Sequence, residues 1–286
     1  MNVLKLINGF NNKKRGWLII VIGVFIIIKM ITGSAFTITD LGLIMLCFFC
    51  ELMDSSLGMG YGTTLTPLLL AVGYDPLQLV PTILFSEFLS GFASSYFHHD
   101  TGNVDFTRRS KDFRTALLLA LGSVVGVAIG VNIAVQIPTA ILNIAIGIII
   151  FIAGVCIWVL HNHVLVYKTW KMFLLASVAS FNKALSGGGY GPLMTSGQIL
   201  SGVNGKASVG ITSFAEGFTC LVGVILFFGK GKGLTLELLL PMVTGALLSV
   251  PFSTEFVKRI NDTTLMKTIA IVTAALGLFT IYKVLV

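Results

Sequence analysis

The stretch Gly58-Met59-Gly60-Tyr61-Gly62 decides the fold of this chain, because a second run, Gly187-Gly188-Gly189-Tyr190-Gly191, repeats it. Both runs lie inside long apolar segments. Each glycine costs a helix about 1 kcal/mol relative to alanine. We therefore expect the backbone to leave the helix at both runs.

The two runs belong to a longer internal duplication. Adding 129 to a residue number carries positions 58–91 onto the second copy without a gap, and nine of these 34 positions are identical. The identical positions in the first copy are Gly58, Gly60, Tyr61, Gly62, Thr66, Gly73, Val80, Phe85 and Glu87. A glycine break followed by Phe-x-Glu in an apolar helix is an unusual pattern to find twice, so we interpret the chain as two repeats.

The composition indicates a membrane protein. The 286 residues are 55% hydrophobic and 11% charged, with a mean hydropathy of +0.94, whereas a soluble domain carries about 25% charged residues. Apolar segments cover 17–38, 41–72, 77–98, 115–137, 139–160, 172–202, 205–229, 235–257 and 263–285. The net charge of +7 does not indicate nucleic-acid binding, because the basic residues lie in short loops between apolar segments.

The basic residues also indicate the topology. With the N-terminus in the cytoplasm, nine spans would divide Lys and Arg almost evenly between the two sides. If both glycine-broken segments are re-entrant, seven spans remain and most basic residues are cytoplasmic. Residues 13–15 are basic and precede the first span, which we interpret as a retained signal anchor rather than a cleaved signal peptide. We expect a multi-pass protein of the cell (inner) membrane, surrounded by the lipid bilayer.

The predicted fold is an all-α polytopic membrane protein. Residues 1–40 hold an N-terminal segment and an extra N-terminal helix, residues 41–160 form repeat one, and residues 161–286 form repeat two. Each repeat contains one re-entrant hairpin and three transmembrane helices, so the second repeat is inverted. The two glycine tips then meet near the bilayer centre, where non-helical backbone must be buried in protein or line a wet cavity.

The tips are the predicted substrate site. Helix starts offer unpaired N–H groups and a positive dipole end, which suit a small anion; we expect these helices to begin near Thr63 and at Pro192. The candidate substrate-binding residues are Gly58, Gly60, Tyr61, Gly62, Thr63, Thr64, Thr66, Lys183, Ser186, Gly187, Gly188, Gly189, Tyr190 and Gly191. There is an alternative to the binding role for each feature. The glycines could serve only to let helices pack closely, and the Lys183 side chain could snorkel to the interface or form an ion pair.

Two intramembrane acids occupy equivalent positions, Glu87 and Glu216. A carboxylate at this depth must be protonated, paired or wet. Such groups could carry coupling protons, or they could be protonated and hydrogen-bonded to an unwound carbonyl. Glu51 and Asp54 precede the first tip, and they could pair with Lys183 or lie in an outward vestibule. Asp54 is the repeat-one counterpart of Lys183.

The glycine motifs GMGYGTTLTPLL and SGGGYGPLM, in a small duplicated membrane protein, resemble those of the sulfite exporter TauE/SafE family. The resemblance covers Leu41 to the C-terminus. It implies export of sulfite, sulfoacetate or related sulfur anions, driven by an ion gradient and without a cofactor. Each tyrosine departs from the family's plain glycine run, which leaves the substrate open.

Other functions fit parts of the sequence. A channel or uniporter would use the same site without coupling to a gradient. A membrane metalloenzyme could use His98, His99, Asp100 and Asp105 with His161 and His163, but the chain has no HExxH, GxSxG or P-loop motif. We interpret the histidines as polar helix ends and the four cysteines as buried small residues, and so expect no enzyme and no metal; the oligomeric state stays open.

Overall fold

The computed structural model describes residues 10–33, 35–137 and 169–261, together with 264, 265, 267, 268 and 271. Every regular element within these residues is a helix, as predicted. The helices are α2 (Asn12–Thr32), α3 (Ile38–Leu57), α4 (Tyr61–Val72), α5 (Pro76–Asp100), α6 (Lys111–Ala134), α8 (Thr169–Ser186), α9 (Tyr190–Leu200), α10 (Gly205–Gly229) and α11 (Leu236–Arg259).

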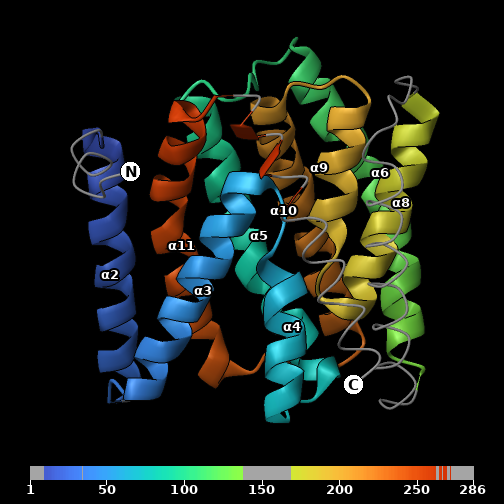
Figure 1. Cartoon of the computed structure of the whole chain (residues 1–286). Helices are drawn as coiled ribbons and strands as arrows, with labels where there is room; N and C mark the ends of the chain where they lie inside the picture. Colours follow the sequence, from blue (N-terminus) through green and yellow to red (C-terminus); the bar gives the residue numbers. More distant parts are fainter. Residues whose placement is uncertain are drawn as a thin grey trace.

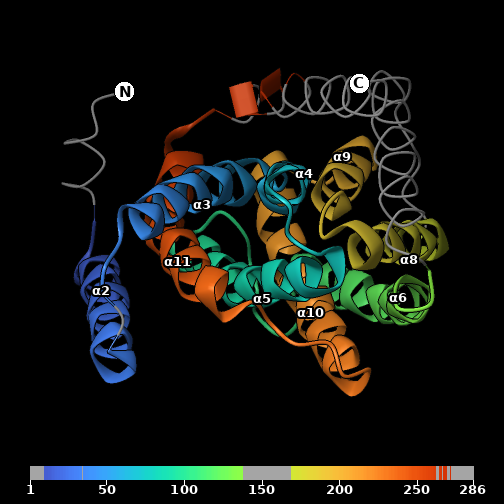
Figure 2. The same cartoon turned by 90° about the horizontal axis from the view of Figure 1, so that it is seen from below.

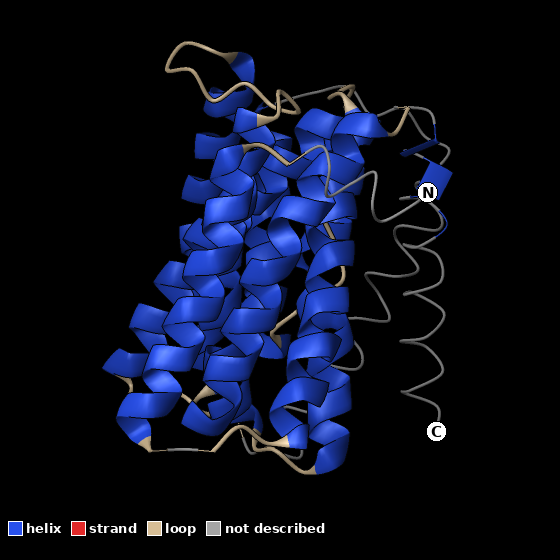
Figure 3. Ribbon diagram, turned by 90° about the vertical axis from the view of Figure 1, so that its left-hand side faces the viewer, coloured by secondary structure: helices blue, strands red, loops and turns tan. Residues whose placement is uncertain are grey.

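The long helices stand side by side in one bundle (Figures 1 and 3). Among the described residues, five helices are long and apolar enough to cross a membrane, namely α2, α5, α6, α10 and α11. They correspond to five of the seven predicted spans. The other two, 139–160 and 263–285, lie wholly or almost wholly outside the described residues, so the total of seven stays a prediction.

The two glycine-broken segments form helical hairpins. In Figure 1, α3 begins and α4 ends at the lower side of the bundle, whereas α8 begins and α9 ends at the upper side. The two hairpins therefore enter the bundle from opposite sides, and their turns meet inside it. Between them pass α5 and α10, which Figure 2 shows in the middle of the bundle.

Local signals in the sequence set the helix ends. Thr37 and Asp40 form a reciprocal capping box at the start of α3. The side chains of Ser110 and Asn204 cap α6 and α10 by accepting backbone N–H groups. Gly73 ends α4 in the left-handed conformation, at φ 104°, which glycine adopts without a steric penalty.

A glycine stripe allows α6 to pack closely on α8. Gly122, Gly126 and Gly130 recur every four residues on one face of α6. A Cβ atom on Gly126 would lie 1.8 Å from the carbonyl oxygen of Ser177, and one on Gly130 would lie 2.8 Å from that of Phe181. These glycines serve close helix packing of the small-xxx-small kind, which is the role that we considered as an alternative for the tips.

The N-terminal helix α2 stands at the edge of the bundle (Figure 2), and most of its apolar side chains face outward. Its bounds differ from the predicted segment 17–38. The helix begins at Asn12, capped by Asn11, and ends before Gly33, whose left-handed backbone (φ 64°) breaks the apolar run. Helix α3 then begins at Ile38, so residues 35–37 lie between the two helices rather than within the first one.

Candidate functional site

Each glycine tip is a short turn between two helices. Gly58 and Gly187, at equivalent positions, both adopt φ 71°, and Gly60 and Gly189 also have positive φ. The next helices begin at Tyr61 and Tyr190, so the predicted starts near Thr63 and at Pro192 were two residues late. Pro192 is the third helical residue, where its missing N–H still removes no intrahelical bond.

The two tips touch through their backbones. A Cβ atom on Gly62 would lie 1.8 Å from the carbonyl oxygen of Gly187, and one on Gly191 would lie 2.1 Å from that of Gly58. Gly62 corresponds to Gly191 and Gly187 to Gly58, so the same contact is made twice, with the roles of the repeats exchanged. Only glycine permits such an approach.

Two threonines repeat this exchange. The Oγ1 atom of Thr66 lies 2.8 Å from the Cβ position of Gly187, and that of Thr195 lies 2.2 Å from the Cβ position of Gly58. Thr195 donates a hydrogen bond to the Gly58 carbonyl (2.9 Å). In addition, Gly189 N–H donates to Thr63 Oγ1 across the tips (3.3 Å). The paired tips are thus related by the same offset of 129 that relates their sequences.

Lys183 links two glutamates beside the tips. Its Nζ atom lies 2.5 Å from Glu87 Oε2 and 2.8 Å from Glu216 Oε1. The three side chains are 1%, 2% and 4% exposed, respectively. They come from α8, α5 and α10, so this ion-paired cluster joins both halves of the chain. Of the alternatives for Lys183, the structure gives the ion-paired one, with Glu87 and Glu216 rather than Glu51 or Asp54 as partners.

The start of α4 is already occupied by carboxylates of the protein. Asp54 Oδ1 accepts a hydrogen bond from Tyr61 N–H, and Glu87 Oε1 accepts one from Gly62 N–H, both at 3.2 Å. Glu87 therefore accepts a hydrogen bond from the first turn of α4 rather than donating one to an unwound carbonyl. These two carboxylates take the positions that we predicted for a bound anion at the first tip.

The other predicted donors divide into two groups. The hydroxyls of Tyr61 and Tyr190 bond to Ser86 (2.7 Å) and Ser123 (3.0 Å), and Ser186 Oγ bonds to backbone of its own turn. The Oγ1 atoms of Thr64 and Thr66 are predicted donors without a hydrogen-bond partner, and two buried atoms outside the predicted set, Glu51 Oε2 and Asn182 Nδ2, also have none. These atoms are available to substrate or water.

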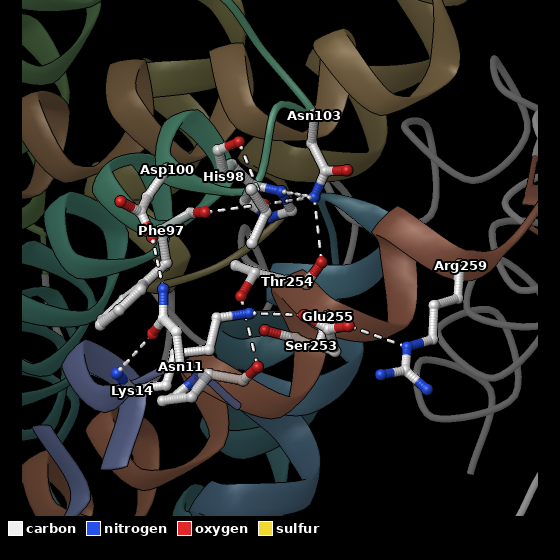
Figure 4. A network of polar contacts seen from close by, with 12 residues as sticks. Asn11, Lys14, Phe97, His98, Asp100, Asn103, Ser253, Thr254, Glu255 and Arg259 are labelled. Atoms are coloured by element: carbon white, nitrogen blue, oxygen red, sulfur yellow. Dashed lines mark hydrogen bonds and ion pairs between the residues drawn. The ribbon is translucent and has the colours of Figure 1, made fainter. Parts of the chain in front are cut away.

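A second polar network ties the upper ends of three helices together (Figure 4). Lys14 of α2 is buried and its Nζ lies 2.9 Å from Glu255 Oε2 of α11, whose Oε1 lies 2.8 Å from Arg259 Nε. Asn103 Nδ2 bonds to His98 Nδ1 and to the Thr254 carbonyl, both at 3.0 Å. This network holds α2, α5 and α11 together.

The histidines considered for a metal site have protein partners instead. His98 Nε2 lies 2.8 Å from the Ser55 carbonyl, and His99 Nδ1 lies 3.2 Å from the Val104 carbonyl. Asp100 pairs with Lys13 at 2.6 Å. No group of three metal-ligating side chains occurs among the described residues; His161 and His163 lie outside them. The cysteines Cys47, Cys50 and Cys220 are free and buried, and Cys156 lies outside the described residues.

Comparison with known proteins decides the family. The sequence profile described as "Sulfite exporter TauE/SafE" matches residues 43–280, which is most of the chain. The chain belongs to the sulfite exporter TauE/SafE family. It is also 25% identical over 226 residues to the "Probable membrane transporter protein YtnM" of Bacillus subtilis (strain 168), covering 74% of this chain and 72% of that protein. No solved structure matches the chain.

This TauE/SafE protein is a helical membrane transporter and not an enzyme, in line with its family and with that relative. The sequence predicted the helix breaks at both tips, which the structure has; the role of Lys183 and the two glutamates stays a prediction, and the sequence did not indicate the partners of these groups. It assigned no role to Ser86, Ser123, Thr195 or Asn182. The offset of 129 could have found Thr195, which is the counterpart of Thr66; no sequence pattern marks the two serines.

Proposed function

We propose that this protein is a secondary transporter that exports small sulfur-containing anions, such as sulfite or sulfoacetate, by alternating access. Its two hairpins are re-entrant, and the halves 41–160 and 161–286 are inverted repeats about the tips. The observation that carries the proposal is the buried cluster of Glu87, Lys183 and Glu216 beside two interlocked tips. A buried charged cluster is expensive in a membrane and favours a functional role.

The closed tips support alternating access. Backbone contact between Gly62 and Gly187 leaves no room for an ion to pass between these residues. Transport then requires the hairpins to separate on one side at a time, as in other transporters built from inverted repeats. The other glycine contact, between Gly191 and Gly58, would open in the same movement.

The cluster also supports proton coupling. Lys183 is the one cation bonded to Glu87 and Glu216 among the described residues. An anion that draws Lys183 away leaves a buried carboxylate without its partner, and such a group is favoured in its protonated form. Anion binding and proton uptake are then linked through Lys183, with Glu87 and Glu216 carrying the coupling protons.

The test is anion flux into proteoliposomes with sulfite, sulfoacetate, thiosulfate or sulfate, with and without an imposed pH gradient. We expect gradient-dependent flux of at least one anion, lost in Glu87→Gln and Glu216→Gln. Flux that is independent of the pH gradient and unchanged in both Gln variants would indicate a channel or uniporter. Absence of flux for all four anions would refute the sulfur-anion assignment.

A further inference from the structure

The two tips differ in charge at one equivalent position. Asp54 lies four residues before Gly58, and Lys183 lies four residues before Gly187. At the first tip, Asp54 Oδ1 accepts a hydrogen bond from Tyr61 N–H, so a carboxylate of the protein lies at the start of α4. At the second tip, Lys183 turns to Glu87 and Glu216 instead.

The start of α9 therefore lacks the carboxylate that α4 has. Tyr190 and Gly191 are its first two residues, and neither N–H has an acceptor among the hydrogen bonds of the described residues. Pro192 follows and has no N–H to offer. Two N–H groups and the positive end of the α9 dipole remain for an anion from outside the protein.

A second observation indicates a ligand at the same place. Asn182 is 2% exposed, and its Nδ2 atom has no hydrogen-bond partner. That atom lies 2.2 Å from the Cβ position of Gly189, the residue that precedes α9. A buried donor without a partner is destabilising, so this amide indicates an acceptor that the protein does not supply.

The first repeat provides an internal comparison. Met53 corresponds to Asn182, and its Cε atom lies 2.3 Å from the Cβ position of Gly60, which corresponds to Gly189. The two side chains thus occupy the same place relative to their tips. The repeat whose helix start already has a carboxylate carries an apolar side chain there, and the repeat whose helix start lacks one carries a hydrogen-bond donor.

We propose that the start of α9 and Asn182 form the anion subsite of this transporter, so that the substrate binds at the second tip and not at the first. The N–H groups of Tyr190 and Gly191 and the Asn182 amide donate to the oxygens of a sulfite, sulfonate or similar oxyanion. This anion takes the place that the Asp54 carboxylate takes at the first tip. The inference rests on the proposed function.

The subsite is covered in the present conformation. The Gly58 carbonyl lies 2.1 Å from the Cβ position of Gly191, and a carbonyl oxygen repels an anion. The first tip must therefore move away before the anion binds. Binding at the second tip then favours the separated tips, which gives the substrate a direct effect on the opening step.

The experiment measures anion binding separately from transport. Titration calorimetry on purified protein in detergent uses sulfite, sulfoacetate, thiosulfate and sulfate. Asn182→Leu removes the donor, Asn182→Asp puts a carboxylate near the helix start with almost no change in size, and Met53→Leu is the matched control at the equivalent position. Size-exclusion profiles and melting temperatures establish that each variant is folded.

We expect wild-type protein to bind at least one of these anions. Asn182→Leu should weaken binding about tenfold or more, Asn182→Asp should abolish it, and Met53→Leu should change it less than about twofold. Unchanged binding in a folded Asn182→Asp protein, or no binding of any of the four anions to wild type, would overturn the subsite. Binding with the expected pattern but without flux in proteoliposomes would refute transport and leave the subsite standing.

Discussion

Lys183 of α8 and Glu216 of α10 form a buried ion pair, with 2.8 Å between Nζ and Oε1, and the same Nζ lies 2.5 Å from Glu87 of α5. Lys183→Met leaves two carboxylates buried without a cation. We expect it to lower the free energy of unfolding by about 3–5 kcal/mol. Denaturant titration in detergent micelles measures this change.

A rescue experiment separates charge from packing. In the Lys183→Met background, Glu87→Gln together with Glu216→Gln should restore most of the lost stability, because no unpaired charge remains buried. Lys230→Met, at an exposed residue of the same charge, is the control and should change stability by less than about 0.5 kcal/mol. If the triple variant is as unstable as Lys183→Met, the lost contacts of the lysine stem, not its charge, explain the effect.

The glycines at the tips should not tolerate a methyl group. Gly62→Ala places a Cβ atom 1.8 Å from the Gly187 backbone oxygen, so the tips must separate or the protein must unfold. We expect a lower melting temperature and faster maleimide labelling of Cys220, which is buried beside Glu87 (3.8 Å from Sγ to Oε2). Gly191→Ala should have the same effect.

Gly23→Ala serves as the matched control for these changes. Gly23 lies within α2, and a Cβ atom there meets nothing within 4 Å. Since alanine favours helix by about 1 kcal/mol over glycine, this variant should keep or slightly raise the melting temperature. Normal stability and labelling in Gly62→Ala would show that the tips have room to separate at little cost.

The proposed topology predicts which loops are accessible from outside the cell. With a cytoplasmic N-terminus, the exposed Lys230 between α10 and α11 faces outward, and the exposed Arg108 between α5 and α6 faces the cytoplasm. In a Cys156→Ser background, a membrane-impermeant maleimide should label Lys230→Cys in intact cells and Arg108→Cys only after permeabilisation. The reverse pattern would place the N-terminus outside.

The attachment of α2 should depend on Lys14. Its side chain is 2% exposed and pairs with Glu255, which also pairs with Arg259. Because Arg259 remains in Lys14→Met, we expect a smaller loss than for Lys183→Met, about 1–3 kcal/mol. A double-mutant cycle with Glu255→Gln measures the coupling.

Lys13→Met is the control: Lys13 is 61% exposed and pairs with Asp100, so its loss should cost under about 1 kcal/mol. Equal losses in the two variants would contradict a special role for the buried pair.

The sequence alone determined the broad features of this protein. An apolar chain with few charges has to be covered by lipid, and glycine runs weaken a helix wherever they occur. These are local or compositional properties, so they could be found without knowing which helices are neighbours. The offset of 129 also identified Glu87 and Glu216 as equivalent residues, although it did not indicate their common partner.

Only the tertiary structure decided which polar groups meet. Lys183 could have paired with Glu51 or Asp54, yet α8, which packs on α6 and α9, places its end where Lys183 meets Glu87 of α5 and Glu216 of α10. Asp54 reaches the start of α4 because the Gly58 turn brings the chain back on itself. Helices that are apolar on all sides carry no periodic signal for the face that each buries. The neighbours of a polar side chain in such helices therefore depend on close packing between segments distant in the sequence.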